Sequence, residues 1–182
     1  GDELIAACLS TGEEYMFLAS RQGKAIRFHE KEVRAMGRPA RGVRAMDLGE
    51  GDYLVAAEVV KEEGLMLSIS ENGFGKRTPL KVYRLTRRGG KGVINMKTSS
   101  RTGMVVSVLA VQPDSDLMII TQDGKIIRLE AGEIRKAGRS TQGVRLVRID
   151  DGDRVAAASV IPGENGSGGE NGGAAQPDLA LQ

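Results

Sequence analysis

Aromatic residues, cysteine and histidine are all scarce in this sequence, and each shortage excludes a class of function. Aromatic residues make up 3% of the 182 residues and tryptophan is absent, so aliphatic side chains and methionine must fill any core. A single cysteine, Cys8, cannot form an intrachain disulfide. A zinc site built from cysteine and histidine needs about four ligands, and Cys8 and His29 alone cannot supply them.

Long apolar runs are missing as well. None approaches the roughly 20 residues that span a bilayer, and no signal peptide opens the chain. We therefore expect a soluble, cytoplasmic protein without a membrane partner. In such a protein Cys8, which lies in the apolar run at residues 4–9, is expected to be a buried strand thiol. Four methionines in apolar strands are expected to lie in the core: Met16, Met66, Met104 and Met118.

Basic residues are missing only from the end of the chain. No lysine or arginine follows Arg154, whereas Glu164, Glu170 and Asp178 do, so the body of the chain carries 26 basic and 21 acidic residues. Residues 163–182 are rich in glycine and of low complexity, and we expect them to form a disordered acidic tail.

Glycine, by contrast, is abundant and recurs with a fixed spacing. Two glycines lie 19 residues apart in each of three segments, and the segments are offset by 50 and then 51 residues: Gly23 and Gly42, Gly73 and Gly92, Gly124 and Gly143. The first glycine of each pair follows an apolar run and precedes another extended segment, which is typical of a β-hairpin. Each segment closes with an apolar strand, at residues 53–60, 104–111 and 154–161.

This periodicity predicts an all-β, propeller-like array of repeats of about 50 residues, with four short strands per blade. We place the blades at residues 13–63, 64–114 and 115–162, and expect residues 1–12 to be the closing strand of a truncated preceding blade. Because repeats of this kind bury their apolar faces on one another, the chain is expected to be a fragment of a larger array.

Basic residues recur at matching places in the repeats, after the hairpin and around the second glycine. The candidate DNA-binding residues are Arg38, Arg41, Arg44, Lys76, Arg77, Arg87, Arg88, Gly89, Gly90, Lys91, Gly92, Lys125, Arg128, Arg139 and Arg145. Lysine and arginine on glycine-rich loops suit a phosphate backbone, because glycine lets main-chain N–H groups approach the phosphates. No recognition helix or aromatic platform is evident, so we expect sequence-independent binding of duplex DNA that weakens steeply with salt.

The run Tyr83-Arg84-Leu85-Thr86-Arg87-Arg88-Gly89-Gly90-Lys91-Gly92-Val93-Ile94-Asn95 closely resembles the C-terminal domain of gyrase A proteins, which belong to the type IIA topoisomerases. The same family is resembled by two further segments, residues 42–48 with 51–52 and residues 124–128. The resemblance covers about residues 2–161. It implies a β-pinwheel that wraps duplex DNA around a basic rim and supports ATP-dependent negative supercoiling by DNA gyrase. The partners it implies are the other parts of gyrase A, together with gyrase B.

Residues 86–92 match the seven-residue box of that family at every position except the first, where Thr86 replaces glutamine. In the family the box belongs to the first blade, so we interpret residues 86–92 as a box-like loop of a later blade. The resemblance also implies that this chain alone has no catalytic activity and no cofactor, because the cleavage tyrosine lies elsewhere in gyrase A, whereas ATP and Mg²⁺ are used by other domains. It implies nucleoid-associated residence in the cytoplasm.

Two alternatives stay open. The C-terminal domain of topoisomerase IV is related but tends to have fewer blades and no box, and residues 87–92 argue against it. The other is a propeller that binds proteins and has no role with nucleic acids, in which the basic loops are ordinary solvated turns.

Overall fold

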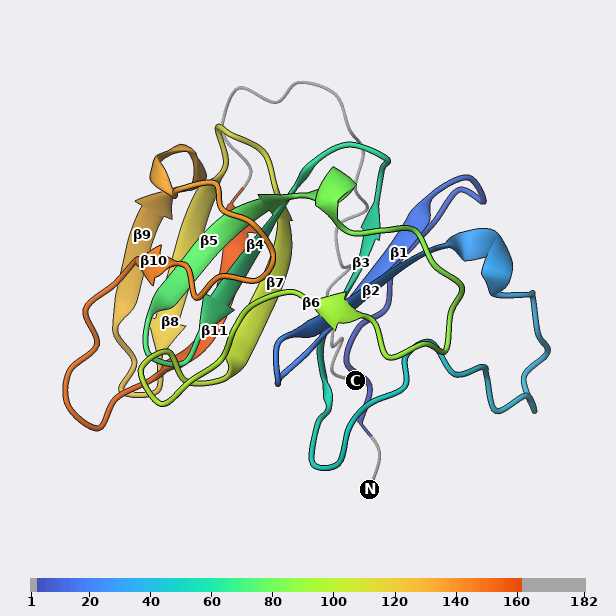
Figure 1. The fold of residues 1–182 in the computed structure, drawn as a ribbon, viewed down its shortest axis with the longest axis horizontal. Coiled ribbons are helices and arrows are strands. Elements are labelled where there is room, and N and C mark those ends of the chain that lie inside the picture. Colours follow the sequence, from blue (N-terminus) through green and yellow to red (C-terminus); the bar gives the residue numbers. More distant parts are fainter. Residues whose placement is uncertain (1–2, 162–182) are drawn as a thin grey trace, which may run out of the picture.

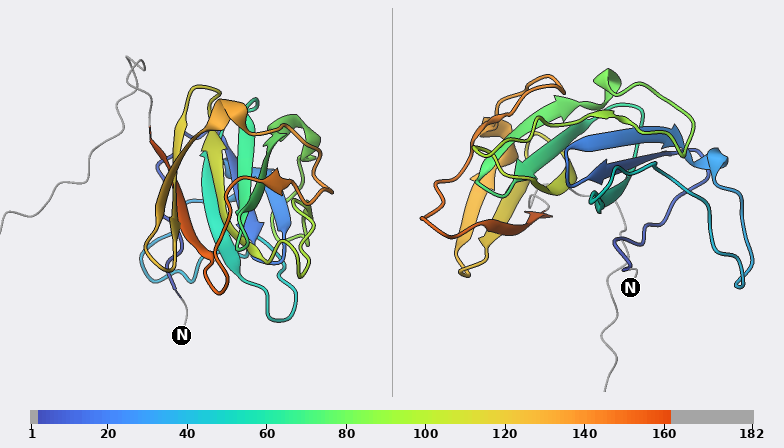
Figure 2. Two further views of the ribbon diagram at one scale, coloured as in Figure 1. Left: turned by 90° about the vertical axis from the view of Figure 1, so that its left-hand side faces the viewer. Right: turned by 60° about the horizontal axis from the view of Figure 1, so that its bottom comes forward.

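The computed structural model describes residues 3–161, which form three small antiparallel sheets (Figure 1). The first sheet has the order β3 (Leu54–Val60), β1 (Tyr15–Ser20), β2 (Lys24–His29) and β6 (Val93–Ile94). The second has the order β10 (Val144–Arg145), β5 (Phe74–Pro79), β4 (Leu65–Ser70) and β7 (Val105–Val111). The third contains β11 (Val155–Ile161), β8 (Asp116–Thr121) and β9 (Ile126–Glu130). The sheets follow one another in an arc (Figure 2), which confirms the predicted all-β repeat.

The hairpins lie where the glycines indicated. β1 pairs with β2 around Gly23, β4 with β5 around Gly73, and β8 with β9 around Gly124. Each second strand runs into one turn of 3-10 helix: η1 (Glu30–Glu32), η2 (Leu80–Val82) and η3 (Ala131–Glu133). The residue after each turn has an extended backbone, so each turn ends after three residues and does not continue as an α-helix.

The fourth strand of a sheet comes from the next repeat along the chain. β6 belongs to the second repeat but pairs with β2 of the first, and β10 of the third repeat pairs with β5 of the second. The corresponding segment of the first repeat, around Val43, is not a strand in the structure. Sequence periodicity alone did not reveal this exchange, because the repeat length is the same whether a strand stays in its own sheet or crosses to its neighbour.

Strand exchange explains the second glycine of the second and third pairs. Gly92 and Gly143 have positive φ values of 69° and 76°. A Cβ atom on Gly92 would lie 2.3 Å from the Ala25 carbonyl oxygen, and one on Gly143 would lie 2.4 Å from the Gly75 carbonyl oxygen. Only glycine allows the crossing strand to approach the neighbouring sheet this closely.

The core fills the space between successive sheets. Alternate residues of β1, Phe17 and Ala19, pack with Met66, Phe74 and other residues of the second repeat in one apolar cluster. On the opposite face of β4, Leu67 and Ile69 pack with residues of the third repeat. The middle sheet is therefore covered on both faces, which matches the repeat principle that each blade buries its apolar face on a neighbour.

Three expectations about individual segments are wrong. Residues 4–9 form no strand, Leu4 and Leu9 are almost fully exposed, and Cys8 is exposed rather than buried. A strand requires a hydrogen-bonded neighbour, and no β-ladder within residues 3–161 includes this segment. Met104, expected in the core with Met16, Met66 and Met118, precedes β7 and is exposed. The acidic tail at residues 163–182 lies outside the described residues.

Candidate nucleic-acid interface

Each repeat presents one basic loop after its 3-10 turn. We call residues 37–44 loop 1, residues 86–92 the box-like loop and residues 138–145 loop 3, which ends with the crossing strand β10. The side chains of Arg38, Arg41 and Arg44 are exposed in loop 1, and those of Arg87 and Lys91 are exposed in the box-like loop. In loop 3, Arg145 is exposed and Arg139 is half-buried.

The three loops are connected in series by arginine side chains. In the box-like loop, Arg88 donates from Nε to the Glu32 carbonyl at 3.0 Å and from Nη1 to the Arg44 carbonyl at 3.1 Å. In loop 3, Arg139 donates to the carbonyls at the matching positions one repeat later, which are Val82 at 2.8 Å and Ile94 at 2.9 Å. The box-like loop and loop 3 are therefore each tied to the flanks of the loop before it, so the three loops follow one another from repeat to repeat.

Backbone contacts hold the box-like loop on the first repeat. The Thr86 N–H donates to the Arg27 carbonyl at 2.9 Å, and the Gly89 N–H donates to the Ala45 carbonyl at 2.6 Å. Gly90 lies over Ile26, with its nearest side-chain atom 3.8 Å from where a Cβ would stand. The exposed Arg87 and Lys91 are consequently carried by a fixed main chain, as a phosphate-binding surface requires.

An aromatic ring supports the cations at the end of loop 3. The guanidinium carbons of Arg101 and Arg145 lie 4.9 Å and 5.1 Å from the centroid of the buried Phe74 ring. These residues line a groove of about 370 Å³ beside the acidic turn that contains Asp150. Cation–π contacts of this kind stabilise a guanidinium by roughly 0.5–1 kcal/mol at exposed sites and fix its position without neutralising its charge.

Lys76 and Arg77 are placed differently from the sequence interpretation, because both are buried in β5. The register shows the reason for Lys76: it pairs with Ser68 as Ile26 pairs with Leu18, so it occupies a core position of the sheet. Arg77 donates to the carbonyls of Ile134 at 2.7 Å and Gly132 at 2.6 Å, and so joins the second repeat to the third. The expectation that both side chains lie among the exposed basic residues was therefore wrong.

Lys125 and Arg128 are exposed but paired with carboxylates. Lys125 forms an ion pair with Asp150, and this hydrogen bond raises the pKa of the lysine. Arg128 forms an ion pair with Asp116. Both side chains could contact phosphate only in competition with these acids.

One recurring set of arginines was not among the DNA-binding residues predicted from the sequence. Arg34, Arg84 and Arg135 follow the three 3-10 turns at offsets of 50 and 51 residues, and all three are exposed. Aligning the three repeats shows this recurrence. The three arginines lie outside the glycine-rich segments that contain most of the predicted basic residues. Arg101, on the loop before β7, was also missed, and nothing in the repeat indicates it.

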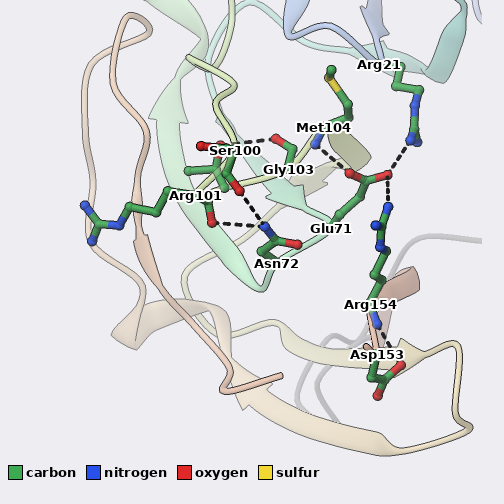
Figure 3. Close-up of polar contacts among 10 residues, drawn as sticks. Arg21, Glu71, Asn72, Ser100, Arg101, Gly103, Met104, Asp153 and Arg154 are labelled. Atoms are coloured by element: carbon green, nitrogen blue, oxygen red, sulfur yellow. Dashed lines mark hydrogen bonds and ion pairs between the residues drawn. The ribbon is translucent and has the colours of Figure 1, made fainter. Parts of the chain in front are cut away.

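One buried carboxylate, that of Glu71, contacts residues of all three repeats (Figure 3). Glu71 forms ion pairs with Arg21 of the first repeat and, at 3.8 Å, with Arg154 of the third. Its Oε2 also accepts a hydrogen bond from the Met104 N–H at 2.8 Å. Glu71 thus links all three repeats and helps to set the curvature along which the basic loops are arranged.

Within residues 3–161, no group of histidine, cysteine and acidic side chains is arranged to hold a metal ion. Among the same residues no helix is long and apolar enough to cross a membrane.

The blades exchange strands with their neighbours and follow one another in an arc, and arginine side chains connect their basic loops. This arrangement defines a β-pinwheel. A family model described as the DNA gyrase C-terminal domain, beta-propeller, matches residues 14–61, 65–112 and 115–162. The chain belongs to this family, the C-terminal domain of gyrase A.

Relatives and solved structures agree with this assignment. The chain is 43% identical over 166 residues to the gyrase A protein of Aminobacterium colombiense and 41% identical over 166 residues to that of Staphylococcus epidermidis. These matches cover 91% and 90% of the chain but 20% and 19% of the relatives, so the chain spans about a fifth of their length.

A solved gyrase A C-terminal domain superposes with a TM-score of 0.77 at 30% identity, covering 82% of this chain and 51% of that one. A C-terminal domain of topoisomerase IV superposes with a TM-score of 0.79 at 24% identity, covering 84% and 48%, which shows a shared fold.

Proposed function

We propose that this chain binds duplex DNA without sequence preference along the three basic loops, as part of the DNA-wrapping surface of gyrase A. The observation that carries the proposal is the serial arrangement of the loops, in which Arg88 and Arg139 tie each loop to the one before it. Exposed cations spaced along a curved surface favour bent DNA, whose elastic cost of a few kcal/mol the added phosphate contacts must offset.

In the holoenzyme this surface would hold DNA beside the cleavage site, with the remainder of gyrase A and with gyrase B as partners. ATP and Mg²⁺ would act on other domains, and the complex would be associated with the nucleoid in the cytoplasm. The chain by itself would contribute binding and curvature and no covalent chemistry.

The topoisomerase IV alternative is disfavoured by the box-like loop, in which residues 87–92 keep the basic–Arg–Gly–Gly–basic–Gly pattern. A propeller that binds only proteins would not need the exposed cations to recur. Measured binding must distinguish these functions, because all of them use the same fold.

The test is the affinity of the chain for linear duplex DNA over a salt series, measured by fluorescence anisotropy. Each phosphate contact contributes about −0.9 to the slope of log K against log salt, so several contacts give a slope of several units. Replacing Arg87 and Lys91 with alanine should reduce the slope by about 2. The matched control replaces the exposed Lys31 and Lys61, which lie outside the loops, and should reduce it by much less. A slope near zero for the unaltered chain refutes DNA binding.

A further inference from the structure

Loop 3 is organised by a buried lysine that has no counterpart under the box-like loop. Lys76 is fully buried in β5, and its Nζ donates to the carbonyls of Gly138 and Arg139, each at 2.6 Å, and to Thr141 Oγ1 at 3.1 Å. All three acceptors belong to loop 3 and none of them is charged. A single ammonium therefore gathers the loop that carries Arg139 and leads into Arg145.

The corresponding position in the other repeats is apolar. Ile26 pairs with Leu18 in the first repeat and Ile127 pairs with Ile119 in the third, just as Lys76 pairs with Ser68. Ile26 lies beneath the box-like loop, where a Cβ added to Gly90 would stand 3.8 Å from the Ile26 side chain. A buried charge costs free energy unless its hydrogen bonds are satisfied, so a lysine at a site where isoleucine fits needs its loop contacts to compensate.

We infer that Lys76 is a positioning residue for DNA binding, whose charged ammonium holds loop 3 in the conformation that presents Arg139 and Arg145. The inference rests on the proposed function for its effect on DNA, but the ordering of the loop is a separate and directly measurable consequence. The two loops therefore rest on different side chains: the isoleucine at position 26 lies beneath the box-like loop, and a hydrogen-bonded lysine lies beneath loop 3.

The ammonium has three N–H donors for the three acceptors of loop 3, so its hydrogen bonds are all satisfied. Burial and, to a smaller degree, the nearby Arg139 guanidinium lower the pKa of Lys76 to about 8. Of the other titratable groups around this site, Tyr83 is uncharged near pH 8, because burial raises its pKa to about 12. The other charged side chains beside this site are Arg77, the next residue of β5, and Arg145 of the neighbouring strand β10.

The decisive experiment is amide hydrogen exchange on the whole chain and on Lys76→Met, which keeps the volume and removes the donors. The Lys97 amide donates to the Thr141 carbonyl of loop 3, and the Ala137 amide, next to loop 3, donates to the Arg77 carbonyl. Exchange of these two amides should become at least about tenfold faster, while the Thr86 and Gly89 amides of the box-like loop stay unchanged. Lys61→Met, which removes an exposed lysine outside the loops, is the charge-matched control and should change neither set. Equal exchange of the Lys97 and Ala137 amides in the wild type and Lys76→Met overturns the inference.

DNA affinity supplies the functional readout. Lys76→Met should weaken DNA binding by about three- to tenfold at low salt. It should also reduce the slope of log K against log salt in proportion to the phosphate contacts that loop 3 makes, whereas Lys61→Met should have a smaller effect on both. If the chain binds no DNA at all, the proposed function fails, and the exchange experiment still decides the role of Lys76. If loop 3 loosens but affinity is unchanged, Lys76 orders the loop without positioning it for DNA and the inference is wrong.

Lys76→Ile covers the case in which Lys76→Met does not fold, because isoleucine stands at the matching position of the first and third repeats. Exchange of the Lys97 and Ala137 amides should again become faster, with the Thr86 and Gly89 amides of the box-like loop as the internal reference. Parallel behaviour of the two sets of amides contradicts the inference.

Discussion

Replacing Glu71 with glutamine tests whether one carboxylate holds the three repeats together. The carboxamide keeps an oxygen that can accept from the Met104 N–H, so the substitution removes the negative charge and little else. The side chain of Glu71 is 10% exposed and that of Arg21 is 28% exposed, which places this ion pair between a surface pair and a buried one.

The expected loss of stability on replacing Glu71 follows from this intermediate burial. Exposed ion pairs contribute about 0.2–1 kcal/mol, and breaking a fully buried pair costs about 3–5 kcal/mol. We therefore expect Glu71→Gln to lower the free energy of unfolding by about 1–2 kcal/mol, with a smaller loss at high salt because the arginines retain access to water. Glu71→Ala also leaves the Met104 N–H without its acceptor, which adds about 1–3 kcal/mol.

Urea denaturation at low and high salt measures these values. The matched control is Glu13→Gln, which removes an ion pair with Lys31 whose side chains are 74% and 62% exposed. That control should change the free energy of unfolding by less than about 0.5 kcal/mol. If Glu71→Gln costs no more than Glu13→Gln, the carboxylate does not join the repeats and the reasoning fails.

Two further predictions concern the crossing strands and the buried lysine. Gly143→Ala should destabilise the chain by at least about 2 kcal/mol more than Gly42→Ala in urea denaturation, since both have positive φ but only Gly143 meets a neighbouring carbonyl; equal losses would show that the close approach is unimportant. For Lys76, the folded-state pKa of about 8 lies below the unfolded value of 10.5, so the unfolded chain binds more protons between these values and folding stability rises with pH there. The stability of the wild type relative to Lys76→Met should therefore increase by about 2–3 kcal/mol from pH 7 to pH 10, and a constant difference between them would contradict the lowered pKa.

The sequence by itself determined the repeat, the hairpins and the family. The turns at Gly23, Gly73 and Gly124 depend on local chemistry, in which a residue with positive φ separates two apolar runs, and such chemistry can be read without the fold. The closing strands were equally clear because their apolar pattern extends over seven residues. The basic box-like loop stood out because its residues are consecutive in the chain.

Tertiary structure alone decided which lysines and arginines are accessible. Lys76 and Arg77 look like the exposed cations of the loops in sequence, yet strand register buries one in the sheet and carbonyls of the next repeat bind the other. Strand exchange was hidden for a similar reason, because hydrogen bonding between distant segments leaves the period of the sequence unchanged. Local pattern fixes the elements of this chain, whereas pairing between repeats determines which charges stay buried and which reach the surface.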